Sequence, residues 1–345
     1  MTLSTPKATT ITNETRPKGD ISVLFCGGTG CDIAAKFTQK LKQVSTEDQA
    51  ALANIHAGII DTSRSNLNEH HSGLSLYILK ANGKEMDGGG KDMMGAYKGT
   101  KQQFEDIYLA MKPQKTTLLI CNMGGGSGGA IASQMAQGLL ERGHDVIVLG
   151  IVAVESRVVQ ENSTRTLALM QRASTESNRT LVLSPFLAGK TNTFEGINTM
   201  ISDYAFMLSV LYSNQNKRLD SSDLHNWVNY EKTLKMQPAL MGSYITVGDS
   251  ALPEEVTPFT VATLTTDEEQ DAAPGWTPDY QAHGILPIKP NFAMATPVHF
   301  VVATGVVEQI NNRINESVAA LQREAAQRQV PKPLAAPAAS MEGFD

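Results

Sequence analysis

Short apolar runs alternate along the chain with segments in which apolar residues recur at every third or fourth position. Apolar runs bounded by turn-forming residues predict buried strands, and the three- to four-residue spacing predicts helices that pack on them. Strands that alternate with helices form a parallel, doubly wound sheet of the Rossmann type, so we expect an α/β fold. The predicted strands cover residues 21–26, 59–60, 118–121, 146–152 and 180–183.

A long amphipathic segment separates two parts of the chain. Residues 195–216 carry apolar side chains at helical spacing and predict a central helix about 33 Å long. Strand-like segments follow from residue 237, with an acidic, proline-bearing loop expected at 266–282 and a helix at 308–329. The predicted division is a disordered N-terminal arm (1–19), a first domain (20–193), the central helix with the loop after it (194–236), a smaller α+β domain (237–329) and a Pro/Ala-rich tail (330–345).

Glycine-rich loops lie among the predicted strands. The first comprises Gly27, Gly28, Thr29 and Gly30, the second Gly88, Gly89 and Gly90, and the third Gly124, Gly125, Gly126, Ser127 and Gly128. Asp61 ends the strand at 59–60. Doubly wound sheets bind ligands beyond the carboxyl ends of their strands, and bare backbone N–H groups bind phosphate there. The loops therefore predict a polyphosphate site, and the absence of a G-x-x-x-x-G-K-[ST] motif excludes a P-loop protein.

Two other interpretations of the third loop stay open. Gly125-x-Ser127-x-Gly129 fits the nucleophile elbow of a serine hydrolase, for which downstream histidines are available. An elbow needs only its two flanking glycines, whereas a phosphate cradle uses the whole run, so we favour the cradle. Tight turns that serve packing alone are the remaining possibility. The candidate histidines are His225, His283 and His299.

Composition narrows the function classes. Hydrophobic residues make up 41% of the 345 residues, ample for a core, and the net charge of −6 argues against an undirected nucleic-acid binder. No apolar run reaches the roughly 18 residues of a membrane span, and the N-terminus lacks the apolar stretch of a secretory signal. Three cysteines, Cys26, Cys31 and Cys121, cannot all pair, which favours a reducing cytoplasm.

The glycine loops resemble those of the tubulin/FtsZ superfamily. The segment GGGSGGA, from Gly124 to Ala130, is similar to its signature G-G-G-T-G-[TSA]-G. The loop GGTG at residue 27 resembles the first phosphate loop of that superfamily. The second glycine loop of this chain, DGGGK, which contains Gly88, resembles the loop that is numbered third in the superfamily. Ser127 stands in place of threonine and keeps the hydroxyl. The match covers about residues 20–230 closely and implies a tubulin-like GTPase.

The same resemblance implies roles for side chains outside the loops. Glu161 and Arg165 resemble a pair beside the ribose and guanine in bacterial FtsZ. Phe194 and Asn198 resemble the base-stacking ring and the base-reading amide at the start of the central helix. LDSSDLHNW, at residues 219–227, is most similar to the catalytic loop of the tubulins of large bacteriophages, and its acidic members are Asp220 and Asp223. Arg218 stands where FtsZ has an asparagine, and Thr199 replaces the acidic base reader.

The implied activity is GTP hydrolysis coupled to self-assembly. The resemblance implies GTP/GDP and Mg²⁺ as cofactors, with no protein-built metal site, and head-to-tail filaments of the chain with itself. Phage filaments of this kind position the replication compartment, and with it DNA or capsids, in the cytoplasm of the infected host. No direct nucleic-acid or membrane partner is expected. The implied tail contact, through Glu342, Phe344 and Asp345, is with the neighbouring subunit.

Helix length alone predicts where hydrolysis occurs. If Phe194 lies at the nucleotide, Asp220 and Asp223 lie about 30 Å away, and catalysis needs contacts of about 3 Å. The aspartates then act on the nucleotide of the next subunit, where they orient the attacking water. Helix capping is the alternative role for both, although Asp223 would lie inside the first turn. Rival functions are a GTP-binding filament protein with little hydrolysis and a serine hydrolase that uses Ser127.

Overall fold

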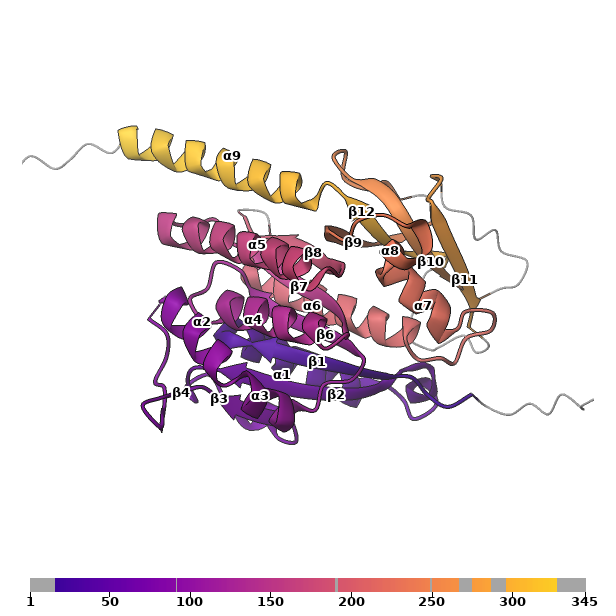
Figure 1. Cartoon of the computed structure of the whole chain (residues 1–345), viewed down its shortest axis with the longest axis horizontal. Coiled ribbons are helices and arrows are strands. Elements are labelled where there is room, and N and C mark those ends of the chain that lie inside the picture. The colour runs from indigo at the N-terminus through magenta and orange to yellow at the C-terminus, as the bar shows by residue number, and fades with distance from the viewer. Residues whose placement is uncertain are drawn as a thin grey trace, which may run out of the picture.

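A mixed ten-stranded sheet forms the centre of the molecule (Figure 1). The computed structural model describes residues 16–90, 92–189, 192–248, 250–266, 275–286 and 296–327. The strand order is β11-β10-β12-β9-β8-β7-β6-β1-β2-β3, parallel from β9 to β3, with β12 antiparallel to β9 and β10. The strands are β1 (Asp20–Cys26), β2 (Asn54–Asp61), β3 (Ser75–Ile78), β6 (Thr116–Asn122), β7 (Asp145–Val152), β8 (Leu181–Leu187), β9 (Leu240–Val247), β10 (Thr257–Thr265), β11 (Tyr280–Ile285) and β12 (Val298–Thr304), and a separate hairpin pairs β4 (Lys80–Ala81) with β5 (Lys84–Glu85).

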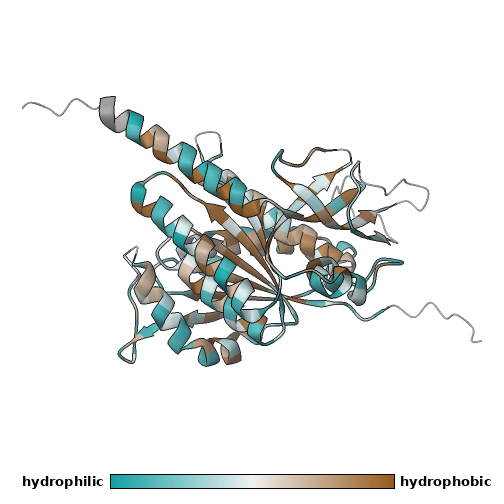
Figure 2. Cartoon of the chain, turned by 45° about the horizontal axis from the view of Figure 1, so that its top comes forward, coloured by the Kyte–Doolittle hydropathy of each residue, from teal (hydrophilic) through white to brown (hydrophobic). Residues whose placement is uncertain are grey.

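Helices cover both faces of this sheet, which confirms the predicted α/β fold. One apolar core joins the sheet to α1 and α6, and a second joins its other face to α3, α4, α5 and α9. In Figure 2 the brown strands run between helices whose outer surfaces are teal. The helices are α1 (Gly27–Gln43), α2 (Met93–Gln102), α3 (Phe104–Met111), α4 (Gly128–Glu141), α5 (Arg157–Ser177), α6 (Phe194–Leu211), α7 (Ser221–Val228), α8 (Tyr230–Leu234) and α9 (Val306–Gln327), with short 3-10 turns η1 (Asp48–Ala51) and η2 (Glu69–His71).

Alternating side chains explain how two cores form on one sheet. In β1, Val23 and Phe25 belong to the first core, whereas Leu24 and Cys26 belong to the second, because successive side chains of a strand point to opposite faces. All eight residues of β7 are buried. Strands buried on both faces are typical of parallel sheets covered by helices.

Several predicted boundaries were wrong. Helix α1 begins at Gly27, so the first glycine loop, which was expected to precede a helix, is itself the first turn of that helix. The central helix α6 ends at Leu211, about five residues early, and is about 27 Å long. Asn214, with φ 58°, lies in the left-handed region just beyond that end. The expected loop at 266–282 gives way to β11 from Tyr280, which pairs with β10.

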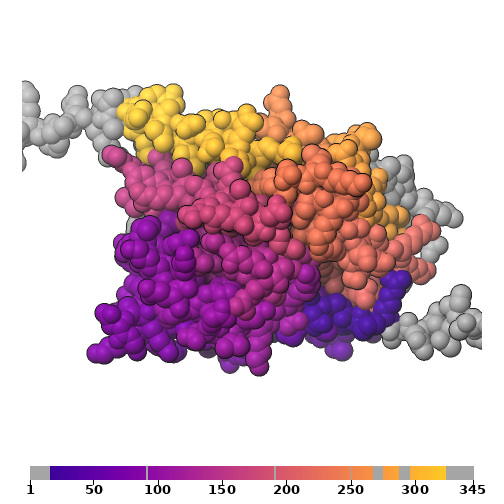
Figure 3. All heavy atoms as spheres, in the orientation of Figure 1, coloured from indigo at the N-terminus to yellow at the C-terminus, as the bar shows by residue number. Residues whose placement is uncertain are grey.

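The sheet continues without a break from β8 to β9, where the α+β domain was expected to begin. Figure 3 shows the orange and yellow C-terminal part packed directly against the magenta part. The division into domains stays a prediction. Of the predicted arm, Arg16 to Gly19 are described, and Gly19 donates its N–H to the Ser213 carbonyl at 3.0 Å. The predicted tail, including Glu342, Phe344 and Asp345, lies outside the described residues. None of the described helices is both long and apolar enough to cross a bilayer.

Candidate nucleotide site

A cavity of about 480 Å³ lies at the carboxyl edge of the sheet, beyond β1, β2 and β6. The parallel strands bring their following loops to this edge, so residues up to 102 positions apart share one cavity. Eight of the predicted residues line it: Gly28, Thr29, Asp61, Gly88, Gly89, Gly125, Ser127 and Gly128. Cys26, Thr62, Ser63, Ser65, Asn66 and Asn122 complete the lining.

Two helix N-termini at this cavity lack side-chain caps. Cys26 and Ser127 occupy the N-cap positions of α1 and α4, and neither side chain accepts a hydrogen bond from its helix. Neither helix has an acidic residue in its first turn. By contrast, the N-cap of α2, Asp92, accepts from Met94 and Gly95. Uncapped N–H groups with a positive dipole end suit an anion, and none of the residues that line the cavity is Lys or Arg.

Some glycines of these loops are needed because another part of the chain approaches them too closely for a side chain. A Cβ on Gly28 would lie 2.7 Å from the Asn66 amide nitrogen, and one on Gly128 would lie 2.7 Å from the Cys26 carbonyl oxygen. Gly27, with φ +75°, packs directly on Gly128 and so joins the first loop to the third. These close approaches hold the loops together around the cavity.

Other predicted glycines do not line the cavity. A Cβ on Gly30 would meet the Phe25 carbonyl carbon at 3.0 Å, and one on Gly124 would meet the Val159 side chain at 2.5 Å. Gly126 is buried, and Gly90, with φ +52°, is a turn residue. The packing of Gly124 against Val159 accounts for one glycine of the run without a phosphate, and the use of the whole run by a phosphate cradle stays a prediction.

Asp61 brings a buried carboxylate to the cavity wall. Its side chain is 1% exposed, and its Oδ1 accepts the Thr62 N–H at 2.7 Å. Its Oδ2 accepts from the Asn66 amide at 3.0 Å, and the Cys31 Sγ lies 3.7 Å from the same oxygen. Burial, and then the nearby Asp61 charge, raise the pKa of the Cys31 thiol well above its usual range. The thiol is therefore protonated and donates to the carboxylate.

The local geometry of Ser127 does not support a hydrolase. Its φ of −94° and ψ of −48° are ordinary helical values, whereas a nucleophile elbow is a strained turn. His283 and His299 bond Thr265 and Thr263 on β10, five strands away from β6, which is about 24 Å at the usual strand spacing. His225 bonds Asp145 at the start of β7, at the opposite edge of the sheet.

Phe194 and Asn198 lie at the start of α6, outside the lining of the cavity formed by the glycine loops. Phe194 is 39% exposed and lines a separate groove of about 600 Å³ between the loops after β7 and β8 and helix α9. Asn198 is 5% exposed, and its buried Oδ1 has no hydrogen-bond partner among the described residues. Asn198 lines neither this groove nor the glycine-loop cavity, so its part in reading the base stays a prediction.

Asp220 and Asp223 lie at the other edge of the sheet. A cavity of about 330 Å³ there is lined by Asp220 together with Asp20, Thr116 and Asp145, which are the first residues of β1, β6 and β7. The cavity formed by the glycine loops lies beyond the last residues of β1 and β6. One strand of seven residues, about 20 Å, therefore separates the aspartates from the glycine loops of the same subunit.

Both aspartates cap helix α7. Asp220 Oδ1 accepts the N–H groups of Ser222 at 2.8 Å and Asp223 at 3.0 Å. Asp223 Oδ2 accepts the Asp220 N–H in return at 3.0 Å, and its Oδ1 accepts from the Tyr280 hydroxyl at 3.1 Å. Although Asp223 lies inside the first turn, as expected, it takes part in the cap, because the pair forms a reciprocal capping box. Arg218, two residues earlier, has φ 73°, a conformation that asparagine adopts more readily.

Comparisons with known proteins bear on this arrangement. No family model matches the sequence. A phage tubulin-like protein of Pseudomonas phage phiKZ is 23% identical over 307 residues, which are 85% of this chain and 88% of the relative. A protofilament of TubZ from bacteriophage PhiKZ superimposes with a TM-score of 0.75 at 23% identity, over 92% of this chain and 97% of that one. The phage tubulin PhuZ with GDP superimposes with a TM-score of 0.76 at 21% identity, over 92% and 95%.

The chain has the tubulin fold. The resemblance to the tubulin/FtsZ superfamily, and to its phage members, is thereby confirmed. In this tubulin fold the three glycine loops converge at one edge of the sheet, and the predicted catalytic loop lies at the other.

The structure does not bring Glu161 and Arg165 to the cavity wall. Both lie on α5, where Glu161 accepts from Arg157 at 2.9 Å and pairs with Arg165 at 3.7 Å. Their side chains are 44% and 59% exposed. Their part in nucleotide binding stays a prediction.

Sequence reasoning missed several residues of both edges. Thr62, Ser63 and Asn66 follow Asp61 along the cavity wall, and the cluster of small polar residues after a strand was the signal. Tyr280 contacts Asp223 from 57 positions away, and Asp145 contacts His225 from 80 positions away. No local sequence pattern predicts contacts of this range.

Proposed function

We propose that this chain is a phage-encoded, tubulin-like GTPase that polymerises head to tail into dynamic filaments. The observation that carries the proposal is the pair of uncapped helix N-termini, α1 and α4, which meet across the glycine loops in a cavity of about 480 Å³. Such a site binds a polyphosphate through backbone N–H groups. The name and fold of the phage tubulins support a guanine nucleotide as the ligand.

The lining of the cavity fits GTP and Mg²⁺. The backbone amides of Gly28, Gly125 and Ser127 would hold the phosphates. Mg²⁺ is commonly held by one or two carboxylates together with substrate phosphates, and Asp61 is the buried carboxylate on this wall. The described residues contain no group of three acidic, His or Cys side chains that could hold a metal alone. When bound, the cation would balance the phosphate charge.

Recognition of the base falls to the start of α6. The unpaired Oδ1 of Asn198 suits the N–H groups on the edge of guanine, and the partly exposed ring of Phe194 offers a stacking surface. Glu161 and Arg165 would need to swing from their surface ion pair to reach the ribose.

Hydrolysis occurs, in this proposal, where two subunits meet. Asp220 and Asp223 face away from the glycine loops of their own subunit, so they act only if a second copy docks its loops against α7. The same contact repeated along one axis does not close and builds a filament. The carboxylates then orient and polarise the water that attacks the nucleotide of the neighbour.

The proposed role is to position the phage replication compartment, DNA or capsids in the cytoplasm of the infected bacterium. It is supported by the phage origin of the relatives and by the protofilament formed by one structural neighbour. The partner is the chain itself, with the tail contacting the adjacent subunit. A filament protein that binds GTP without useful hydrolysis is the main rival, and labelling of Ser127 by a fluorophosphonate would favour a serine hydrolase.

Electron microscopy of the purified chain with GTP, with GDP and without nucleotide tests the proposal. We expect filaments with GTP only. Gly89→Asp is the matched negative variant, because Gly89 lines the cavity and a Cβ there meets nothing closer than 3.7 Å, so the fold is kept while a carboxylate enters the phosphate site. Gly275→Asp adds the same charge at an open position and should still form filaments. Filaments from Gly89→Asp, or none from the parent chain, would contradict the proposal.

A further inference from the structure

Helix α7 carries Asp220 and Asp223 but is too short to fix its own orientation. It spans eight residues, and isolated helices of that length are marginal in water. One side of it, Leu224, Trp227 and Val228, is buried, and Thr260 on β10 donates its hydroxyl to the Trp227 carbonyl at 2.6 Å. These contacts attach the helix to the C-terminal strands. They leave open what holds it to the nucleotide-binding half of the sheet.

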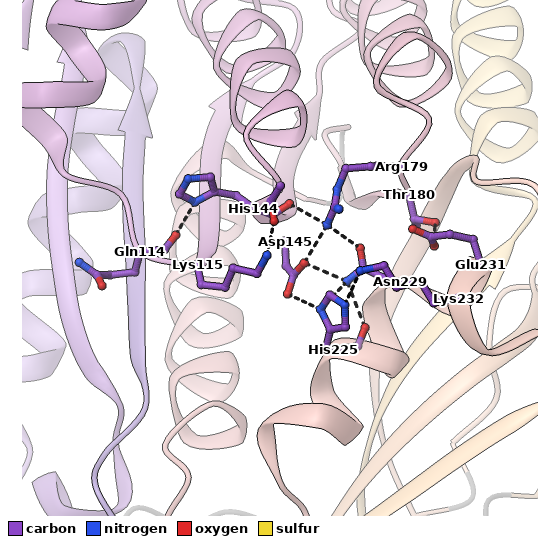
Figure 4. A network of polar contacts seen from close by, with 11 residues as sticks. Gln114, Lys115, His144, Asp145, Arg179, Thr180, His225, Asn229, Glu231 and Lys232 are labelled. Atoms are coloured by element: carbon purple, nitrogen blue, oxygen red, sulfur yellow. Dashed lines mark hydrogen bonds and ion pairs between the residues drawn. The ribbon is translucent and has the colours of Figure 1, made fainter.

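A polar network supplies that second attachment (Figure 4). Asp145, 5% exposed at the start of β7, receives hydrogen bonds from three directions. Its Oδ1 accepts from Arg179 at 3.2 Å and from Asn229 at 2.9 Å, and its Oδ2 lies 3.0 Å from His225 Nδ1. Because a carboxylate oxygen only accepts, His225 carries its proton on Nδ1. Lys232 then donates to the free Nε2 of His225 at 2.7 Å.

His225 and Asp223 lie on opposite sides of α7. They are two residues apart, which is about 200° around a helix axis. Asp223 accepts from Tyr280 on β11, whereas His225 meets Asp145 on β7. The helix is therefore held between β11, the first strand of the sheet order, and β7, which lies five strands along it, and the two contacts together fix its rotation about its own axis.

We propose that Asp145 and His225 are positioning residues for the hydrolysis of the neighbouring subunit's nucleotide. They touch neither the phosphates nor the attacking water. Through the contact of His225 with Asp145, they set the direction in which Asp223 leaves α7. The proposal rests on the proposed function, because it assigns Asp223 its role at the contact between subunits.

The arrangement separates positioning from folding. Arg179 and Asn229 both bind Asp145 without His225, so removing the imidazole leaves the buried carboxylate paired. His225 is also partly exposed, with 27% of its side chain accessible. His225→Ala should consequently fold, whereas loss of Asp145 would leave Arg179 without its buried partner.

The test compares GTP turnover per polymerised subunit in four proteins. His225→Ala should lower it about tenfold, because a small misplacement of a catalytic group is costly. His225→Asn restores a donor near the place of Nδ1 and should recover most of the loss. Thr180→Val removes a neighbouring hydrogen bond, from Thr180 to Glu231 on α8 at 2.6 Å, and should match the parent chain. Polymer is measured by sedimentation of the same samples, and GTP affinity, measured on unassembled protein, should be unchanged in all four.

Each other outcome overturns the inference. Turnover of His225→Ala equal to the parent chain removes the positioning role, and so does an equal loss in Thr180→Val. If the turnover of His225→Asn is no higher than that of His225→Ala, His225 has only a packing role and does not position Asp223. Asp223→Ala, measured alongside, distinguishes failure of this inference from failure of the proposed function. If Asp223→Ala and His225→Ala both hydrolyse GTP at the parent rate, the proposed function fails. If Asp223→Ala is impaired and His225→Ala is not, only the inference fails.

Discussion

Two damaged subunits should restore each other's GTP turnover if the active site is shared between them. Gly89→Asp damages the phosphate cavity at one edge of the sheet and leaves Asp223 intact at the other. Asp223→Ala removes the carboxylate and leaves the cavity intact. A contact that joins the intact cavity of one variant to the intact Asp223 of the other is complete. Turnover in the mixture should exceed the sum of the two variants measured alone.

The magnitudes follow from the geometry. A Cβ on Gly89 would lie 3.7 Å from the Ser127 Cβ across the cavity, so its carboxylate meets the phosphates at close range. Two like charges about 4 Å apart repel by about 4 kcal/mol at an effective dielectric constant of 20, which weakens GTP binding about 10³-fold. Loss of a positioned acid–base group costs Asp223→Ala about 10²-fold in turnover. If the two variants copolymerised at random in equal amounts, about a quarter of the head-to-tail contacts would be complete, so about a quarter of the parent turnover is the upper limit of the rescue.

The assay is steady-state phosphate release at a total concentration that gives filaments. Asp223→Asn serves as a second version of the catalytic variant, because asparagine keeps an oxygen for the Asp220 N–H and so keeps the helix cap. Co-sedimentation of differently labelled variants shows that both enter the same filaments. Additive turnover in mixed filaments would refute the shared site, since an Asp223 that serves its own subunit predicts no rescue.

Three further predictions concern binding, stability and reactivity. Phe194→Ala should weaken GTP binding by about 1–3 kcal/mol, the usual value of base–aromatic stacking, and titration of a fluorescent GTP analogue measures it; unchanged affinity would place the base elsewhere. Asp220→Ala should lower the free energy of unfolding by about 1 kcal/mol because it removes the N-cap of α7, whereas Asp220→Asn should keep stability and lose turnover; equal denaturation midpoints for the two would count against the cap. Burial raises the pKa of Cys121 to about 12 and that of Cys31 higher still, so little thiolate exists at pH 8 and iodoacetamide should label only unfolded protein; rapid labelling of the native chain would contradict this.

The α/β fold could be predicted because its signals are local. Buried strands such as β6 and β7 are continuous apolar runs, and the ends of parallel strands meet at one edge whatever the details of packing. That rule was sufficient to expect Gly28, Asp61 and Gly125 in one cavity. The sequence could not reveal which glycines line the cavity, because the need for Gly124 comes from Val159, which lies 35 positions later.

Long-range contacts account for the other differences. Strand β11 was missed because the residues before it, in the acidic, proline-bearing segment from 266, show no strand pattern. Its pairing partner, β10, lies on the other side of that segment in the sequence. The bond between Asp145 and His225 spans 80 positions, so neither residue stands out in the sequence. The capping role of Asp223 depends on the φ and ψ of Asp220, which lies in the extended region, and side-chain spacing alone does not determine that conformation.

The dependence of GTP turnover on protein concentration tests the central claim most directly. A site completed by a neighbouring subunit predicts almost no phosphate release per subunit in dilute samples. Above a threshold concentration the rate per subunit should rise, at the same concentration at which protein begins to sediment. A rate per subunit that is constant from the most dilute sample upward, through the onset of sedimentation, would show that each chain hydrolyses its own nucleotide and would contradict the account.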